Sequence, residues 1–251
     1  MNITHMSVSR KTLWDECKKK YYYKYHLKLD PEQEEPFHFT YGKIIHKIAE
    51  EYIEKRGDKS LQEVTKLVTE GHIPIQDNVF APKIPYEYMF RMPGHLQSLE
   101  KITKEIGYEG YLEWDFKYDL DPPNNKFVIG FIDRLILKNN KAFILDYKTT
   151  KRGKYRKTKN TIKKDLQLMT YARIVQKEFN IPAENIHTAL FYLEGGNLIS
   201  SKFSQESLEK AEQTLLECYD EIKDFDEKNA WGNVGYHCRF CEFNKICPFY
   251  K

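Results

Sequence analysis

The sequence lacks the features that mark membrane, secreted and repeat proteins. It has no run of about 18 apolar residues and therefore offers no candidate membrane span. The first residues, MNITHMSVSRK, lack the apolar segment and the small residues of a secretory leader. The chain also contains no internal repeat and no low-complexity linker. These absences favour a globular, cytoplasmic protein.

The chain does not have an even number of cysteines, as a set paired in disulfides would: it has five, Cys17, Cys218, Cys238, Cys241 and Cys247. In a reducing compartment, three cysteines gathered near the C-terminus favour metal ligation over disulfides. Cys238-x-x-Cys241 followed by Cys247 has the spacing of a thiolate metal site, but it supplies only three ligands locally. A fourth ligand must come from elsewhere in the chain. Cys218 falls within a predicted helix, where we expect a small core residue.

Acidic residues are missing from one long basic stretch. The formal net charge is only +3, but residues 151–164 read KRGKYRKTKNTIKK and contain no acid. Such a run neutralises phosphates and releases counterions when it binds nucleic acid. A solvated loop without a ligand is the alternative interpretation. The residues that we expect to contact nucleic acid are Lys151, Arg152, Lys154, Arg156 and Lys157.

The length of 251 residues suits a single domain, residues 1–251. Helical spacing of apolar residues predicts helices over residues 7–29, 40–55, 164–179 and 205–229, with only short helices and loops over 57–93. Apolar runs from residue 107 onward, separated by DPPNN and NN turns, predict a three-stranded antiparallel meander. IHTALFYL predicts a further buried strand over 186–193. This order predicts an α/β fold, a sheet with helical flanks.

Two neighbouring predicted strands carry an acid in an apolar run: GFIDRLIL contains Asp133, and FILDYKTT contains Asp146. A carboxylate buried in a strand needs a cation or hydrogen bonds to compensate its charge. Asp146 and Lys148 are two residues apart, so their side chains project from the same face of a strand. Hard oxygen ligands suit Mg²⁺ or Mn²⁺, which can polarise a phosphoryl oxygen. An ordinary salt bridge between Asp146 and Lys148 is the alternative.

Three motifs together resemble the PD-(D/E)xK nuclease superfamily, specifically its RecB-like branch. They are GFID at residues 130–133, DYK at 146–148 and QLMTY at 167–171. The resemblance implies a restriction-endonuclease-like α/β core over residues 107–194, with a central mixed sheet flanked by helices. It implies the following site residues: Asp133 and Asp146 as metal-binding carboxylates, the Tyr147 carbonyl and His46 as further metal ligands, Lys148 as the catalytic lysine, and Gln167 and Tyr171 as a pair reaching toward the site. Either Glu109 or Glu113 would add a glutamate from an earlier strand.

The N-terminal segment SVSRKTLWDEC, ending at Cys17, resembles the iron-sulfur subgroup of RecB-like nucleases. That subgroup includes the AddB nuclease domain and the CRISPR-associated adaptation nucleases. The resemblance implies a 4Fe-4S cluster held by Cys17, Cys238, Cys241 and Cys247, which would join residues 1–30 to residues 205–251. Lys18 stands where the subgroup often has proline, a position that supplies no ligand. Four thiolates also suit zinc, which is the alternative.

The resemblance implies a divalent-metal-dependent DNA exonuclease that hydrolyses phosphodiester bonds in single strands or at DNA ends. Its setting would be recombination, repair, or phage or CRISPR DNA processing, in the cytoplasm of a bacterial, archaeal or phage-infected cell. The alternatives are a structure-specific or double-strand endonuclease and a non-catalytic nucleic-acid-binding protein with a four-cysteine zinc site. The chain lacks a G-x-x-x-x-G-K-[ST] phosphate loop, so ATP-driven unwinding would need a helicase, recombination or CRISPR partner. We expect no membrane partner, and the sequence leaves the oligomeric state open.

Overall fold

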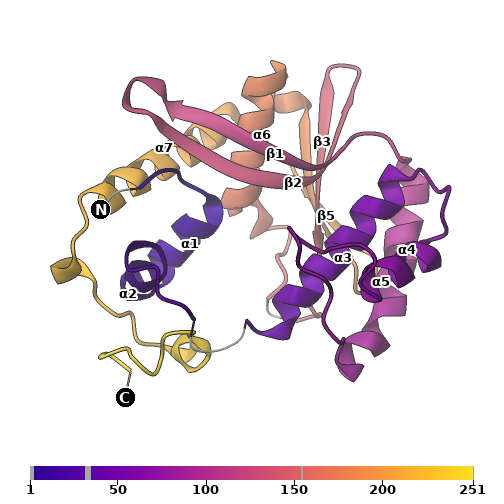
Figure 1. Ribbon diagram of the computed structural model, residues 1–251. Helices are drawn as coiled ribbons and strands as arrows, with labels where there is room; N and C mark the ends of the chain where they lie inside the picture. Colours follow the sequence, from indigo (N-terminus) through magenta and orange to yellow (C-terminus); the bar gives the residue numbers. More distant parts are fainter. Residues whose placement is uncertain (1–2, 32–34, 154, 251) are drawn as a thin grey trace. The chain divides into compact units, whose positions relative to one another are not determined.

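A computed structural model describes residues 3–31, 35–153 and 155–250 of the chain. These residues form an α/β fold around a five-stranded mixed sheet flanked by helices (Figure 1). The chain divides into two compact units, of which one comprises residues 1–35, 115–130 and 209–251 and the other residues 36–114 and 131–208. Among the described residues, no helix is long and apolar enough to cross a membrane.

The sheet has the strand order β1-β2-β3-β4-β5. Its strands are β1 (Tyr111–Asp121), β2 (Lys126–Lys138), β3 (Lys141–Lys148), β4 (Ile186–Tyr192) and β5 (Asn197–Ser201). The first three strands follow one another along the chain, as the meander prediction required. β3 pairs antiparallel with β2 and parallel with β4, because the helix α6 (Leu166–Phe179) carries the chain back between β3 and β4. The edge strand β5, antiparallel to β4, was not predicted.

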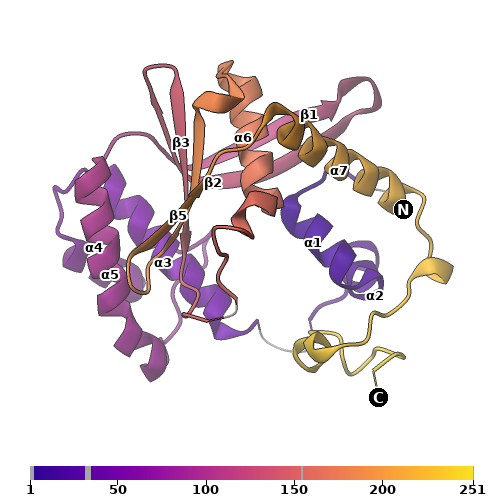
Figure 2. The same cartoon turned by 180° about the vertical axis from the view of Figure 1, so that it is seen from behind.

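Side chains of β3 alternate between two environments in the larger unit. Leu145 and Tyr147 belong to the core formed with α3 (Phe37–Glu54), α4 (Leu61–Thr69) and α5 (Tyr86–Ile106). Asp146 and Lys148 project from the opposite face, and the Lys148 ammonium reaches Gln167 of α6. Figures 1 and 2 show α6 on the other side of the sheet from α3. The alternation of a strand thus places apolar and ionisable side chains on separate faces.

The prediction of short helices and loops over residues 57–93 agrees with α4 but is wrong from Tyr86 onward. The helix α5 has 21 residues, begins at Tyr86 and continues through Pro93. It buries Met92, Leu99 and Ile102 in the core. Proline is unfavourable inside a helix, but packing of an apolar face contributes more to helix stability than local propensity does.

In the smaller unit, the helix predicted over residues 7–29 is interrupted at Cys17. α1 (Val8–Glu16) ends there, and α2 (Lys18–Tyr21) and a π-helical turn (Tyr22–His26) follow. Cys17 itself has an extended conformation, φ −163° and ψ 110°. Trp14 packs edge-on against Tyr21 and Phe225. The final helix α7 (Gln205–Lys223) ends earlier than predicted, before a short 3-10 turn over Glu227–Asn229.

Candidate active site

The strand β3 supplies an acid and a lysine from one face. Asp146 is buried, and its carboxylate lies 2.6 Å from the ammonium of Lys148. Burial raises the pKa of Asp146 to about 6, an effect that Lys148 opposes and the nearby Asp133 reinforces. Burial tends to lower the pKa of Lys148, but the carboxylates of Asp146 and Asp133 outweigh it and raise that pKa. The lysine therefore stays charged beside a carboxylate that protonates more easily than an exposed one.

Asp133 lies on β2, where the backbone pairing of β2 and β3 ends. The last paired residues are Arg134 and Leu145. Beyond them, the Tyr147 N–H donates to the Asp133 carboxylate at 2.6 Å, so the side chain takes the place of a backbone acceptor. Burial raises the pKa of Asp133, against the charges of His46 and Lys148. The two strands separate around a pair of buried carboxylates.

His46 extends from α3 to the same place. Its Nε2 lies 3.0 Å from the backbone carbonyl oxygen of Tyr147, and its Nδ1 lies 3.5 Å from an oxygen of Asp133. Burial opposes protonation of the imidazole, but Asp133 and Glu113 outweigh that effect and raise the pKa of His46 to about 9. The imidazole thus occupies a strongly negative environment.

Glu113 of β1, rather than Glu109, is the glutamate at this site. Its carboxylate lies 3.6 Å from Nδ1 of His46, and its backbone has a positive φ of 42°. Non-glycine residues rarely adopt this conformation, which costs energy and is often found at functional sites. Glu109 is exposed, and its backbone carbonyl accepts a hydrogen bond from Arg134. The sequence left the choice between these two residues open.

Gln167 and Tyr171, one turn apart on α6, complete a chain of polar contacts. The Lys148 ammonium donates to Oε1 of Gln167 at 3.3 Å, and the Gln167 amide donates to the Tyr171 hydroxyl at 2.8 Å. The side chain of Asp165 caps the helix by accepting from the Leu168 N–H. Burial and the nearby Asp146 and Asp133 raise the pKa of Tyr171 far above its ordinary value, so its hydroxyl stays protonated. The structure therefore brings the three motif segments together.

These residues suit a hard divalent cation. His46, Glu113 and Asp133 bring their ligand atoms within 4.8 Å of one another, the only such group of three among the described residues. The Tyr147 carbonyl, 3.0 Å from Nε2 of His46, and the Asp146 carboxylate, which interacts electrostatically with Asp133, are further oxygen donors. A set of mostly oxygen donors with one imidazole fits Mg²⁺ or Mn²⁺. A bound cation would also relieve the repulsion among the carboxylates.

A profile of the PD-(D/E)XK nuclease superfamily matches residues 5–248. The chain belongs to the PD-(D/E)XK nuclease superfamily. Nucleases of this superfamily use divalent metal ions, in agreement with the donor set around Asp133. The match spans both units of this nuclease.

Comparison with solved structures supports the same fold. The nuclease is similar to a protein from Eubacterium rectale that carries the description "Putative exonuclease", with a TM-score of 0.53 and 14% identity over 99% of this chain and 90% of that chain. At this identity the likeness shows the fold alone. The structure of SSO0001 aligns over 92% of this chain and 94% of that chain, with 16% identity and a TM-score of 0.38, too low to carry an argument. A search of curated protein sequences found no match.

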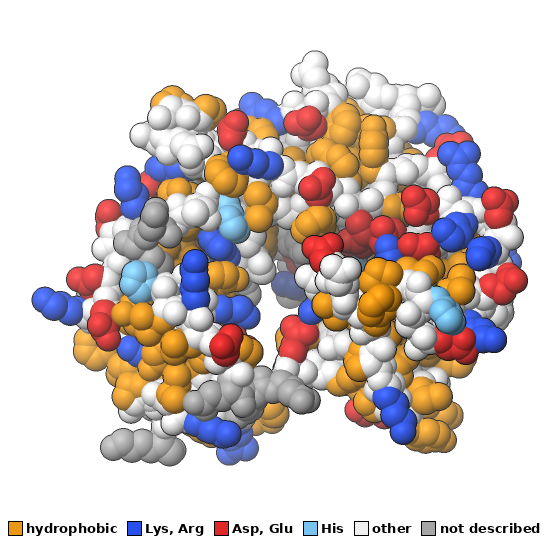
Figure 3. Space-filling model, in the orientation of Figure 1, with side chains coloured by type: hydrophobic (Ala, Val, Ile, Leu, Met, Phe, Trp, Pro, Cys, Tyr) orange, Lys and Arg blue, Asp and Glu red, His pale blue; other side chains and the backbone are white. Residues whose placement is uncertain are grey.

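Part of the basic segment after β3, residues 151–164, is held by hydrogen bonds to the rest of the protein. Arg156 donates to the backbone carbonyls of Thr150 and Glu194, and its guanidinium lies over the Tyr192 ring. The other predicted contact residues differ in their surroundings. Lys151 and Arg152 are exposed, and the Lys151 ammonium lies 4.0 Å from the Glu87 carboxylate. The Lys157 ammonium lies 3.6 Å from the Asp165 carboxylate, and Lys154 lies outside the described residues. Charges of both signs are interspersed on the face that Figure 3 shows. The predicted contact residues thus differ: Arg156 is held by the protein, whereas Lys151, Arg152 and Lys157 are exposed.

One supporting residue gave no signal in the sequence. Arg91 of α5 donates to the backbone carbonyl of Thr149 at 3.0 Å and lies 3.1 Å from a carboxylate oxygen of Glu194. Thr149 directly follows Lys148, so Arg91 fixes the point where the chain leaves β3. An arginine within a helix has no distinguishing pattern, and only the tertiary structure reveals this role.

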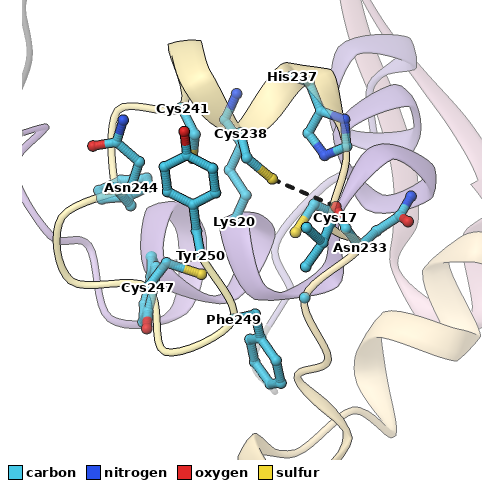
Figure 4. A pocket seen from close by; sticks show the side chains of 14 residues that line it. Cys17, Lys20, Asn233, His237, Cys238, Cys241, Asn244, Cys247, Phe249 and Tyr250 are labelled. Atoms are coloured by element: carbon cyan, nitrogen blue, oxygen red, sulfur yellow. Dashed lines mark hydrogen bonds between the residues drawn. The ribbon is translucent and has the colours of Figure 1, made fainter.

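The four predicted cluster cysteines share one pocket in the smaller unit. Cys17 lies between α1 and α2, and Cys238, Cys241 and Cys247 come from the C-terminal segment (Figure 4). All four are free thiols. The Cys238 thiol contacts the backbone carbonyl of Asn233 at 3.8 Å. The fifth, Cys218, is buried in α7, where burial raises its pKa to about 12, as suits a core residue.

Proposed function

We propose that this chain is a divalent-metal-dependent DNA exonuclease of the RecB-like branch, acting as one nuclease domain on single strands or DNA ends. The observation that carries the proposal is the gathering of His46, Glu113, Asp133 and Asp146 next to the Lys148 ammonium. These residues come from four different elements. A simple stabilising ion pair between Asp146 and Lys148 would not require three further ligand-type groups at the same place.

Mg²⁺ or Mn²⁺ would be held by His46, Glu113, Asp133, Asp146 and the Tyr147 carbonyl. When bound, such an ion polarises a phosphoryl oxygen and lowers the pKa of water. The Lys148 ammonium is held by the Asp146 carboxylate at 2.6 Å and by Oε1 of Gln167 at 3.3 Å, so the position of its positive charge is fixed. A fixed ammonium stabilises the negative charge that develops on phosphate during attack.

The remaining site residues orient these groups. Asp133 holds the Tyr147 N–H, and His46 contacts the Tyr147 carbonyl, so both backbone polar groups of Tyr147 are fixed. Tyr171, kept protonated by its surroundings, holds Gln167 in position for Lys148. Outside this centre, Lys151, Arg152 and Lys157 are the exposed cations that would bind the phosphate backbone. We include Lys154 among the phosphate-binding residues because of its position in the sequence. Arg156 instead holds the backbone of the segment through its hydrogen bonds to Thr150 and Glu194.

The second part of the proposal is a 4Fe-4S cluster bound by Cys17, Cys238, Cys241 and Cys247. The four cysteines line one pocket, although they come from opposite ends of the sequence. The resemblance of the N-terminal segment to the iron-sulfur subgroup favours a cluster over a single zinc ion, which four thiolates would also suit. The cluster would be structural and would connect distant parts of the chain.

The direct test is cleavage of end-labelled linear single-stranded DNA with Mg²⁺ or Mn²⁺ and with EDTA. We expect divalent-dependent cleavage by the wild type and none by Asp146→Ala. Asp58→Asn, an exposed acid on the loop after α3, is the matched control and should cleave normally. A circular single strand separates the two nuclease types, because an exonuclease leaves it intact and an endonuclease cuts it. Absence of cleavage on every DNA form by metal-loaded protein would refute the proposal.

A further inference from the structure

The helix α3 presents one continuous exposed stripe that leads to the candidate metal ligand His46. Phe39, Lys43 and His46 are spaced by four and three residues, which places them on the same side of a helix. The buried side chains, including Tyr41, Ile44 and Ile48, lie on the opposite side. With a rise of about 1.5 Å per residue, Phe39 lies about 10 Å along the axis from His46. This is the axial length of about three stacked nucleotides.

Among the described residues, Phe39 is not part of the core against which α3 packs. Its side chain is 53% exposed, and its ring lies 4.1 Å from the ring of His38, which is exposed too. The first turn of α3 is anchored by other aromatics, since Phe37 and Tyr41 pack on Tyr88 of α5 with ring centroids 4.9 Å and 4.8 Å apart. An exposed aromatic face of this kind can accept a stacked base.

Between Phe39 and His46 the stripe has little bulk. A Cβ placed on Gly42 would meet the Thr149 hydroxyl at 3.9 Å, an ordinary contact. Thr149 directly follows the catalytic lysine, so the stripe adjoins the end of β3 at this point. The exposed Lys43 adds a positive charge on the same path. An aromatic ring, a cation and a slim backbone therefore lie along the side of α3 that carries His46.

We propose that this stripe, Phe39–Lys43–His46, is the track along which a single nucleic-acid strand approaches the metal site, with one base stacked on Phe39. The proposal rests on the proposed nuclease function and specifies its substrate: an unpaired strand. Inside a duplex both faces of each base are covered by neighbouring pairs, so an internal paired base cannot lie on the Phe39 ring, whereas a base of an unpaired strand can. Lys43 contacts a phosphate between the stacked base and the scissile bond.

The test measures binding of a fluorescent oligothymidylate by variants built on non-cleaving Asp146→Ala. Phe39→Ala should weaken binding about 5- to 100-fold, the range expected for loss of one base-stacking contact. Phe39→Trp should restore affinity and show quenched tryptophan emission on binding. Phe90→Ala is the matched control, because Phe90 is 78% exposed on α5 and lies two residues from Tyr88, on a different side of that helix. It should bind as the parent does.

A second arm uses an oligonucleotide of equal length with abasic sites. On this ligand Phe39→Ala should bind as tightly as its parent, because no base is present to stack. Equal losses on both ligands, or no loss on oligothymidylate with melting temperatures unchanged, would overturn the track. If the wild type cleaves DNA but Phe39→Ala does not change binding, the track is refuted and the proposed nuclease function is not. If Phe39→Ala weakens binding only of the oligonucleotide that carries bases, and the wild type does not cleave DNA, the proposed nuclease function is refuted and strand binding along the track is not.

Discussion

The imidazole Nε2 of His46 lies 3.0 Å from the backbone carbonyl oxygen of Tyr147. The two residues are 101 positions apart in sequence, yet this contact joins α3 to β3. The backbone of the same residue is also held by Asp133, whose carboxylate oxygen accepts from the Tyr147 N–H at 2.6 Å. A single residue between Asp146 and Lys148 is thus fixed by both of its polar backbone groups.

Replacing Lys148 by methionine should reduce kcat by about 10²- to 10³-fold, the effect of removing one fixed donor from a developing charge. Metal affinity should change far less, because an ammonium is not a metal ligand. Lys101→Met, on an exposed lysine of α5, provides the control. Single-turnover cleavage and a metal titration measure the two quantities separately. A loss of metal binding without a loss of kcat at saturating metal would contradict this role for Lys148.

His46→Ala should weaken activation by Mn²⁺ by about tenfold or more, since it removes the imidazole from the donor set. Activity should recover in part when the Mn²⁺ concentration is raised. The cation also stabilises the folded protein in proportion to its occupancy, so the melting temperature of the variant should respond to Mn²⁺ only at higher concentration. An unchanged Mn²⁺ dependence in both assays would exclude His46 as a ligand.

Cys17→Ser should abolish the visible absorption of an iron-sulfur cluster and destabilise the protein. Cys17 and Cys238 are separated by most of the chain, and closing a loop of that length corresponds to about 5 kcal/mol by analogy with a disulfide. Cys218→Ala is the control and should keep the chromophore, because Cys218 is a buried core thiol. Iron and sulfide analysis of the purified protein checks the metal. Zinc in place of iron would refute the cluster, and a Cys17→Ser variant with unchanged stability would refute its structural role.

Replacing the exposed cations Lys151 and Lys157 together by glutamine should weaken single-strand binding most at low salt. Each lost phosphate contact lowers the slope of log K against log salt by about 0.7 for a single strand, so the pair should lower it by about 1.4. Lys59→Gln with Lys66→Gln removes equal charge from exposed positions at α4 and serves as the control. Equal slopes for the test pair and the wild type would show that the segment does not contact phosphate.

Stability should fall in mild acid because of His95. This side chain is buried on α5 beside the Tyr41 hydroxyl, at 2.9 Å, and burial, aided by Arg91, lowers its pKa to about 4. The unfolded state, with a pKa near 6.5, binds the proton more readily, so stability is complete above about pH 6.5 and falls as the pH drops toward 4. The difference corresponds to about 3 kcal/mol.

Urea unfolding between pH 7.5 and 4.5 measures this effect. His95→Gln keeps a polar partner for Tyr41 but does not titrate, so its unfolding free energy should depend less on pH than that of the wild type. The difference between the two proteins isolates His95 from all other groups. Parallel curves would mean that His95 is protonated to the same extent in both states.

The antiparallel meander and the shared face of Asp146 and Lys148 were determined by the sequence alone. Turn residues between apolar runs and the two-residue period of a strand are local properties, so they can be read without knowledge of the fold. The helices α3 and α6 were predicted for the same reason, from apolar spacing within one segment. Local signals failed for α5, whose internal Pro93 suggested a break, and for the continuous helix expected across Cys17.

Only the tertiary structure decided which distant groups meet. Nothing in the local pattern distinguishes Glu113 from Glu109, because both lie in the same polar stretch before or within β1. The contact of His46 with Tyr147 and the support of Thr149 by Arg91 depend on the packing of α3 and α5 against the sheet. Such contacts arise between segments far apart in sequence, where strand and helix periods carry no information about pairing. The sequence therefore specified the chemical groups of the site, and the packing of the elements selected and positioned them.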